Sequence, residues 1–158
     1  MSEEKLKRRD ANNEDLRRMG KLTGFLKDLE LISIELIESN LKKTEKFNPP
    51  AVITIESESS YKTLEDMKES FAVYYKFVLM GRQKGKKKDG ITVSARYKVI
   101  FKNTQKLNDE IFNDFFQFQL DVIVWPYFRQ FVQEMISKAN LPPLTLNFFR
   151  AFKKSKRT

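Results

Sequence analysis

The chain of 158 residues contains no cysteine and no histidine. Without cysteine there are no disulfides to indicate an oxidising compartment, and without either residue the commonest zinc sites cannot form, which effectively excludes a structural zinc. The usual general base and the most reactive nucleophile are also missing. The five glycines are scattered and match no GxGxxG or Walker spacing. We therefore expect no metal or cofactor and no enzymatic activity.

Long hydrophobic runs are missing as well. The longest apolar runs fall far short of the roughly 20 residues that a membrane span needs. The N-terminus is charged and shows no apolar core of a signal peptide. A chain of this length fits one domain. These features predict a soluble, cytoplasmic single-domain protein without membrane insertion.

Positive charge and phenylalanine are abundant. The net charge is +9, and 14 residues are Phe. The charge would attract acidic partners, nucleic acid or anionic lipid surfaces without distinguishing among them. The Phe content predicts an aromatic core, with some aromatic surface left for partners.

The N-terminal half divides into an arm, a strand and a proline-broken loop. Residues 1–24 are dense in charge and offer at most a thin apolar helical stripe, so we expect a mobile or partner-docking arm. Residues 29–37 look like a strand whose imperfect alternation indicates either a bulge or cover on both faces. The prolines at 49 and 50 break the chain, which predicts a crossing loop and a second strand from Ala51.

Two further strands are predicted from residues 71–80 and 91–101. The first is apolar on both alternating sets except at Lys76, which predicts cover by helices on one face and another subunit on the other. The second alternates strictly between apolar and polar residues. The polar, glycine-bounded segment 81–90 joins them, and this predicts an antiparallel hairpin.

Two C-terminal helices complete the predicted fold. One should occupy residues 104–120, with Asn103-Thr104 as its N-cap, because apolar residues recur there near the helical period. The next should begin at Pro126 and stop at Asn140 and the proline pair behind it. A basic tail, residues 151–158, is expected to be solvated. The fold class is therefore α+β, a four-stranded antiparallel sheet followed by two C-terminal helices.

The last helix carries the most specific sequence of the chain, Val124-Trp125-Pro126-Tyr127-Phe128-Arg129, with Leu141-Pro142-Pro143-Leu144 behind it. A helix that opens in this way and closes into a Leu-Pro-Pro-Leu turn resembles the last helix of the SecB family of protein-export chaperones. The order of the strands and helices is also that of the family. The resemblance implies a SecB-like chaperone domain over residues 25–150, and a homo-oligomer, a tetramer built as a dimer of dimers.

The resemblance also implies a function. A SecB-like chaperone is an ATP-independent holdase, a protein that binds unfolded polypeptides (clients), here either secretory precursors or an antitoxin. The implied grooves are lined by the crossing loop, the second strand and the last helix. The candidate client-binding residues are Leu41, Phe47, Tyr61, Trp125, Phe128 and Leu144. We expect each to serve the core more than a groove except Phe47, which has little local core to join in its charged loop.

The penultimate helix has a broad aromatic face. Its members are Phe112, Phe115, Phe116 and Phe118. Exposed, this face would exceed what a monomer tolerates, and a homo-oligomer would bury it. The alternative is that these residues cover the chain's own sheet, and we expect both to be partly true.

The charge of the hairpin departs from the SecB pattern. Family members that serve the SecA motor are acidic, whereas the predicted partner-facing charges here are Arg82, Lys84, Lys86, Lys87 and Lys88. This puts the SecA contact in doubt and makes an acidic client conceivable, although a charge run is most often a solvated loop. The rival function is a basic nucleic-acid-binding module. Against it, no aromatic residues alternate with Arg and Lys as a base-stacking strand requires.

Overall fold

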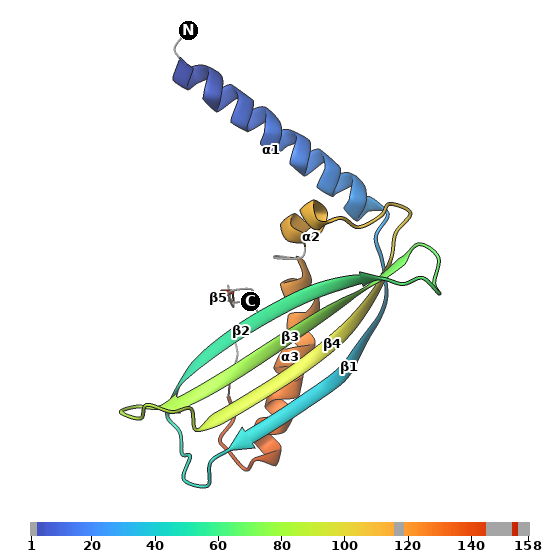
Figure 1. Cartoon of the computed structure of the whole chain (residues 1–158). Coiled ribbons are helices and arrows are strands. Elements are labelled where there is room, and N and C mark those ends of the chain that lie inside the picture. The colour runs from blue at the N-terminus through green and yellow to red at the C-terminus, as the bar shows by residue number, and fades with distance from the viewer. Residues whose placement is uncertain (1–2, 116–118, 145–152, 155–158) are drawn as a thin grey trace.

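The computed structural model describes residues 3–115, 119–144 and 153–154 (Figure 1). These residues form three helices and five strands, in the order α1 (Glu3–Lys27), β1 (Glu30–Lys43), β2 (Ala51–Thr63), β3 (Ser70–Gln83), β4 (Ile91–Lys102), α2 (Asp109–Phe115), α3 (Gln119–Lys138) and β5 (Lys153–Lys154). The predicted α+β class with a four-stranded antiparallel sheet is confirmed.

The strands lie in the order β1-β4-β3-β2-β5. The pairing of β3 with β4, from Ser70 opposite Lys102 to Gly81 opposite Ile91, confirms the predicted hairpin. Because β1 and β2 lie at opposite sides of this hairpin, the loop between them crosses the ends of β3 and β4. The tail was expected to be solvated, yet Lys153 and Lys154 pair with β2 in parallel. The free backbone groups along the outer edge of β2 explain this pairing.

Strand β1 is irregular, as its sequence predicts. Its register with β4 shifts between Leu31 and Ser33 and again between Leu36 and Glu38, which identifies two bulges. The strand forms one edge of the sheet. Four large apolar side chains consequently remain 42–45% exposed: Leu31, Ile32, Leu36 and Ile37.

Helix α3 packs along one face of the sheet and closes an aromatic core (Figure 1). The rings of Phe77 and Phe128 stack with centroids 4.6 Å apart, and Trp125 lies 5.7 Å from Phe77. The prediction that this helix begins at Pro126 is wrong, since Pro126 lies inside α3. A proline there removes a backbone hydrogen bond. The buried stripe begins earlier, at Leu120 and Val124, and its packing holds the helix together through the proline.

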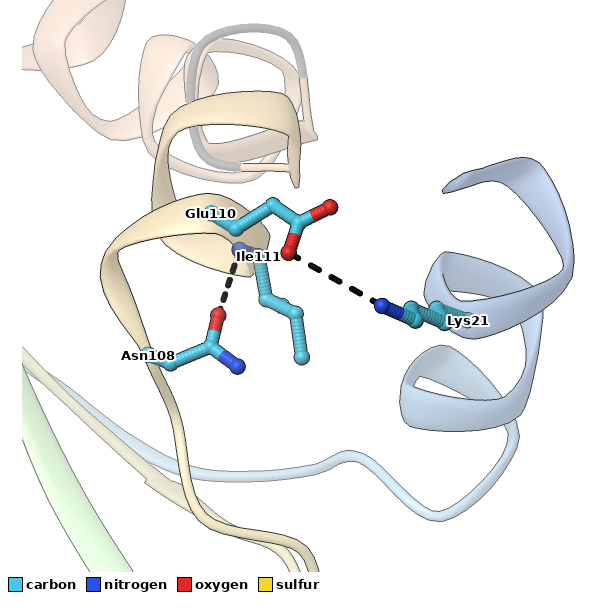
Figure 2. Close-up of polar contacts among 4 residues, drawn as sticks. All are labelled: Lys21, Asn108, Glu110 and Ile111. Atoms are coloured by element: carbon cyan, nitrogen blue, oxygen red, sulfur yellow. Dashed lines mark hydrogen bonds and ion pairs between the residues drawn. The ribbon is translucent and has the colours of Figure 1, made fainter. Parts of the chain in front are cut away.

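The penultimate helix starts later than predicted. Its N-cap is Asn108, whose side-chain oxygen accepts a hydrogen bond from the Ile111 N–H at 2.8 Å (Figure 2). Asn103 is buried instead. Its amide donates to the Phe25 carbonyl at 2.7 Å, and its oxygen accepts from the Gln105 N–H at 2.8 Å. The Asn103 side chain thus joins the end of β4 to the last turn of α1 and is not the N-cap of α2.

Residues 3–27 form one long helix, α1, where the sequence suggested at most a thin helical stripe. Figure 1 shows that it projects away from the sheet. Its C-terminal part is anchored: Phe25 is fully buried beside Phe71, and Lys21 forms an ion pair with Glu110 at 4.0 Å (Figure 2). Helix α1 therefore runs through the boundary expected between residues 24 and 25.

Candidate binding surface

The two faces of the sheet differ in chemistry. The face under α3 is apolar, whereas the open face carries a row of charges across all four long strands. This row consists of Glu58, Lys76, Arg96 and Glu38 in cross-strand register. Lys76 and Glu58 form an ion pair at 3.9 Å, and the Arg96 guanidinium lies 5.2 Å from the Tyr74 ring centroid. The two central cations, Lys76 and Arg96, are flanked by a carboxylate on either side, so this row carries no net charge.

Two of the predicted client-binding residues lie deep in the core. Trp125 and Phe128 are at most 1% exposed and pack from α3 against Phe77 of β3. A side chain packed in this way offers no area to a ligand in this arrangement of the chain. Their role in the structure is to fix α3 on the sheet.

The expectation that Phe47 has little core to join is wrong. Its side chain is 6% exposed and belongs to the main core cluster. Because the loop crosses the ends of β3 and β4, Phe47 reaches Gly81 and Gly90, and it occupies the space that a Cβ would need at Gly90. The sequence signal that could have indicated this burial is the pair of glycines, Gly81 and Gly90. They leave room for an aromatic ring from a segment 34 or more residues earlier in the chain.

Leu41 is half-buried at the end of the sheet that the crossing loop closes, hereafter the crossing-loop end, and Leu144 is half-buried in the segment after α3. Leu41 lies opposite the buried Val93, and Leu144 follows the end of α3, which lies at the same end (Figure 1). Ile53 is also half-buried here, opposite Gly81. Together with Val52, which is 58% exposed opposite Arg82, these aliphatic side chains provide apolar surface at this end.

Tyr61 lies at the opposite end of the sheet. Its ring centroid is 4.6 Å from that of Phe112, and its hydroxyl donates to the Asp109 carboxylate at 2.6 Å. This hydrogen bond, together with partial burial and the negative charge, raises the pKa of Tyr61. The candidate client-binding residues are thus divided among the core and the two ends of the sheet.

Phe112 is buried within its own chain, against Tyr61, so it presents no free surface to another subunit. That supports the alternative in which it covers the chain's own fold. Phe116 and Phe118 lie outside the described residues, as does the side chain of Phe115.

The hairpin cations are all exposed, as expected for a polar loop: Arg82, Lys84, Lys86, Lys87 and Lys88. The structure adds three cations that sequence reasoning missed. Lys42, Lys43 and Lys46 lie at the end of β1 and in the crossing loop, beside the hairpin. The register of β1 on β4, which the sequence does not reveal, brings them together.

A hollow of about 370 Å³ opens at the other end of the sheet, lined by Asp28, Glu30, Glu69, Lys102, Asn103 and Thr104. Its polar lining does not suit an apolar ligand. In the part of the chain that the structure describes, no cluster of three acidic side chains could hold a metal ion. None of the described helices has both the length and the apolar character needed to cross a membrane.

Comparisons with known proteins show which known structures share this fold. No family model matches the chain, and no curated protein sequence matches it. Among solved structures, the chain is similar to the SecB-like chaperone Rv1957 of Mycobacterium tuberculosis, in complex with a ChAD peptide from the Rv1956 HigA1 antitoxin. The TM-score is 0.69 at 17% identity, over 85% of this chain and 97% of that one.

A weaker likeness links the chain to a protein of unknown function from Streptococcus agalactiae. It has a TM-score of 0.46 at 9% identity and covers 76% of this chain and 97% of that one. The chain has a SecB-like fold: an antiparallel sheet, a loop that crosses the sheet from β1 to β2, and a C-terminal helix along one face.

Proposed function

We propose that this protein is a molecular chaperone of the holdase type, which binds unfolded polypeptide segments without ATP. The observation that carries the proposal is the fold shared with Rv1957, whose structure contains a peptide from an antitoxin. Half-buried aliphatic side chains at the crossing-loop end support it, because a ligand defined only by exposed apolar residues needs apolar surface without fixed directional chemistry.

The surface charges favour a dedicated client, such as an antitoxin, over secretory precursors handed to SecA. Glu35 and Glu38 lie opposite Lys98 and Arg96 in the sheet, so the open face is balanced and not acidic. Arg82 and the hairpin lysines add positive charge at one end. A partner that approaches an acidic SecB surface would meet neutralised or reversed charge here, which weakens and slows such an association.

The protein should also act as a homo-oligomer. The exposed apolar side chains of β1 lie on an edge strand, where unpaired backbone groups and apolar area together favour association with another chain. A closed contact between two copies would cover this edge symmetrically. A tetramer, as the sequence resemblance implies, would contain such pairs.

A refolding assay tests the chaperone function. An aggregation-prone polypeptide is diluted from denaturant, and its light scattering is followed with increasing amounts of the protein, with and without ATP. We expect suppression that saturates near stoichiometric amounts and is unchanged by ATP. Scattering equal to that with an inert protein of the same charge would refute the holdase function.

A further inference from the structure

A cluster of positive charge, the basic end, is assembled at the crossing-loop end of the sheet. It combines two segments far apart in the sequence, and all its side chains are exposed. Its members are Lys42, Lys43, Lys46, Arg82, Lys84, Lys86, Lys87 and Lys88. Within residues 42–50 and 82–90 the only acidic residues are Glu45 and Asp89. The excess of positive charge is therefore local to this end.

The two segments of the basic end are tied to each other. The Thr44 N–H donates to the Gly90 carbonyl at 2.9 Å, and the Gln83 side-chain amide donates to the Asn48 carbonyl at 2.7 Å. Beneath these bonds, Phe47 is buried against Gly81 and Gly90. The crossing loop and the hairpin thus form one packed unit, so the backbone that carries the cations is held in place before any ligand arrives.

These cations are unneutralised within the described chain. Among the described residues, Lys21 pairs with Glu110 and Lys76 with Glu58, both away from the crossing-loop end. None of the basic-end cations lies within ion-pair distance of a described carboxylate. Like charges held together destabilise each other, so a carboxylate-rich ligand would gain from several of them at once.

We propose that the basic end binds an acidic segment of a client polypeptide, so that the protein selects clients in which a run of Asp and Glu adjoins an apolar stretch. This inference rests on the proposed chaperone function and specifies its substrate class. Lys42 directly follows the half-buried Leu41, and the half-buried Ile53 lies at the same end, opposite Gly81. An extended client could therefore place aliphatic side chains on these residues and its carboxylates on the cations beyond them.

A polypeptide fits this surface better than a nucleic acid does. The one aromatic residue within the two segments, Phe47, is buried, so the basic end has no exposed ring on which a base could stack. The neighbouring surface is aliphatic, which suits amino-acid side chains.

The test uses two fluorescent 20-residue peptides with the same central Leu, Ile and Val residues, flanked by four Glu in one and four Gln in the other. In the full-length protein, Lys84, Lys86, Lys87 and Lys88 are replaced with Gln. A control variant carries the same change at Lys62, Lys68, Lys102 and Lys106, which are exposed at the opposite end of the sheet. Equal urea-unfolding midpoints for the three proteins show that the substitutions act on binding.

The Glu peptide should bind the wild type about tenfold more tightly than the Gln peptide at 0.1 M salt, since each exposed ion pair contributes roughly a 1.4- to 5-fold change. The hairpin variant should reduce this ratio to less than about threefold, while the control variant retains it. At 1 M salt, where screening acts within about 3 Å, the ratio should approach one.

Several results would overturn the proposal. Equal binding of both peptides by the wild type refutes acidic selection while leaving the chaperone function intact, because the Gln peptide tests apolar binding alone. Binding of neither peptide refutes both. Equal losses in the two variants show that only net charge matters. A 20-nucleotide single strand that binds more tightly than the Glu peptide, and is lost in the hairpin variant, identifies the ligand as nucleic acid.

Discussion

The burial of Phe47 leads to a quantitative prediction about the crossing loop. Removing a buried Phe side chain costs about 3–5 kcal/mol, from lost transfer free energy and the cavity left behind. Phe47 is 6% exposed and lies at the end of the core, so Phe47→Ala should cost about 3 kcal/mol of unfolding free energy. An aromatic side chain in an exposed loop, outside the core, would instead give only a small change in unfolding free energy on replacement by Ala.

The contact with Gly90 can be isolated by a double-mutant cycle. A Cβ at Gly90 would overlap the Phe47 ring, whose Cε2 and Cγ atoms would both lie at 3.1 Å. Gly90→Ala alone should therefore cost about 2 kcal/mol, as overpacking does. In the Phe47→Ala background the ring is gone and the same methyl group should cost close to nothing. The coupling energy should be about 2 kcal/mol in magnitude.

Urea unfolding of the wild type, both single variants and the double variant measures the cycle. All four are compared at one protein concentration, because the stability of an oligomer depends on concentration. Unchanged m-values show that the transitions remain comparable. Additive effects within about 0.5 kcal/mol would refute the packing of Phe47 on Gly90, and a Phe47→Ala cost below about 1 kcal/mol would place this ring outside the core.

Three further predictions concern the alkaline limit, the anchor of α1 and the edge strand. Burial, with a smaller effect of Glu134, raises the pKa of Tyr97, whereas an unfolded tyrosine ionises near pH 10. The free energy of unfolding should therefore be constant below about pH 10 and fall above it by up to about 1.4 kcal/mol per pH unit. Urea unfolding at a series of pH values should show a smaller slope for Tyr97→Phe and an unchanged slope for the exposed Tyr127→Phe. Asn103→Ala removes two hydrogen bonds and should cost about 2 kcal/mol, with faster amide exchange at residues 20–27; Asn108→Ala should leave that exchange unchanged. Leu36→Glu should lower the mass seen by light scattering while the exposed Leu16→Glu on α1 does not, and a monomeric wild type would contradict the oligomer.

The elements that the sequence predicts well are those with a strong local pattern. Strand β4 alternates strictly and begins and ends within one residue of its predicted bounds. The prolines at 49 and 50 and the glycine-bounded segment 81–90 also mark correctly where the chain leaves one strand and enters the next. In each case the local signal and the tertiary packing agree.

The failures arise where tertiary contacts override local signals. Pro126 reads as a helix start, but Leu120 and Val124 already carry the stripe that packs on the sheet. Phe47 reads as a loop residue, because its partners Gly81 and Gly90 are distant in the sequence. The basic end depends on the pairing of β1 with β4 and on the crossing of the loop, and neither can be inferred from charge counts along the chain.

The central claim is that this protein recognises polypeptides because they are unfolded. The most direct measurement is the fluorescence anisotropy of one labelled polypeptide, native or permanently unfolded by reduction and carboxymethylation, titrated with the protein in the absence of ATP. The account predicts saturable binding of the unfolded form and none of the native form. Equal binding of both forms would contradict it. So would binding of neither form at about 10 μM protein, since a dissociation constant of that size corresponds to a binding free energy of roughly −7 kcal/mol.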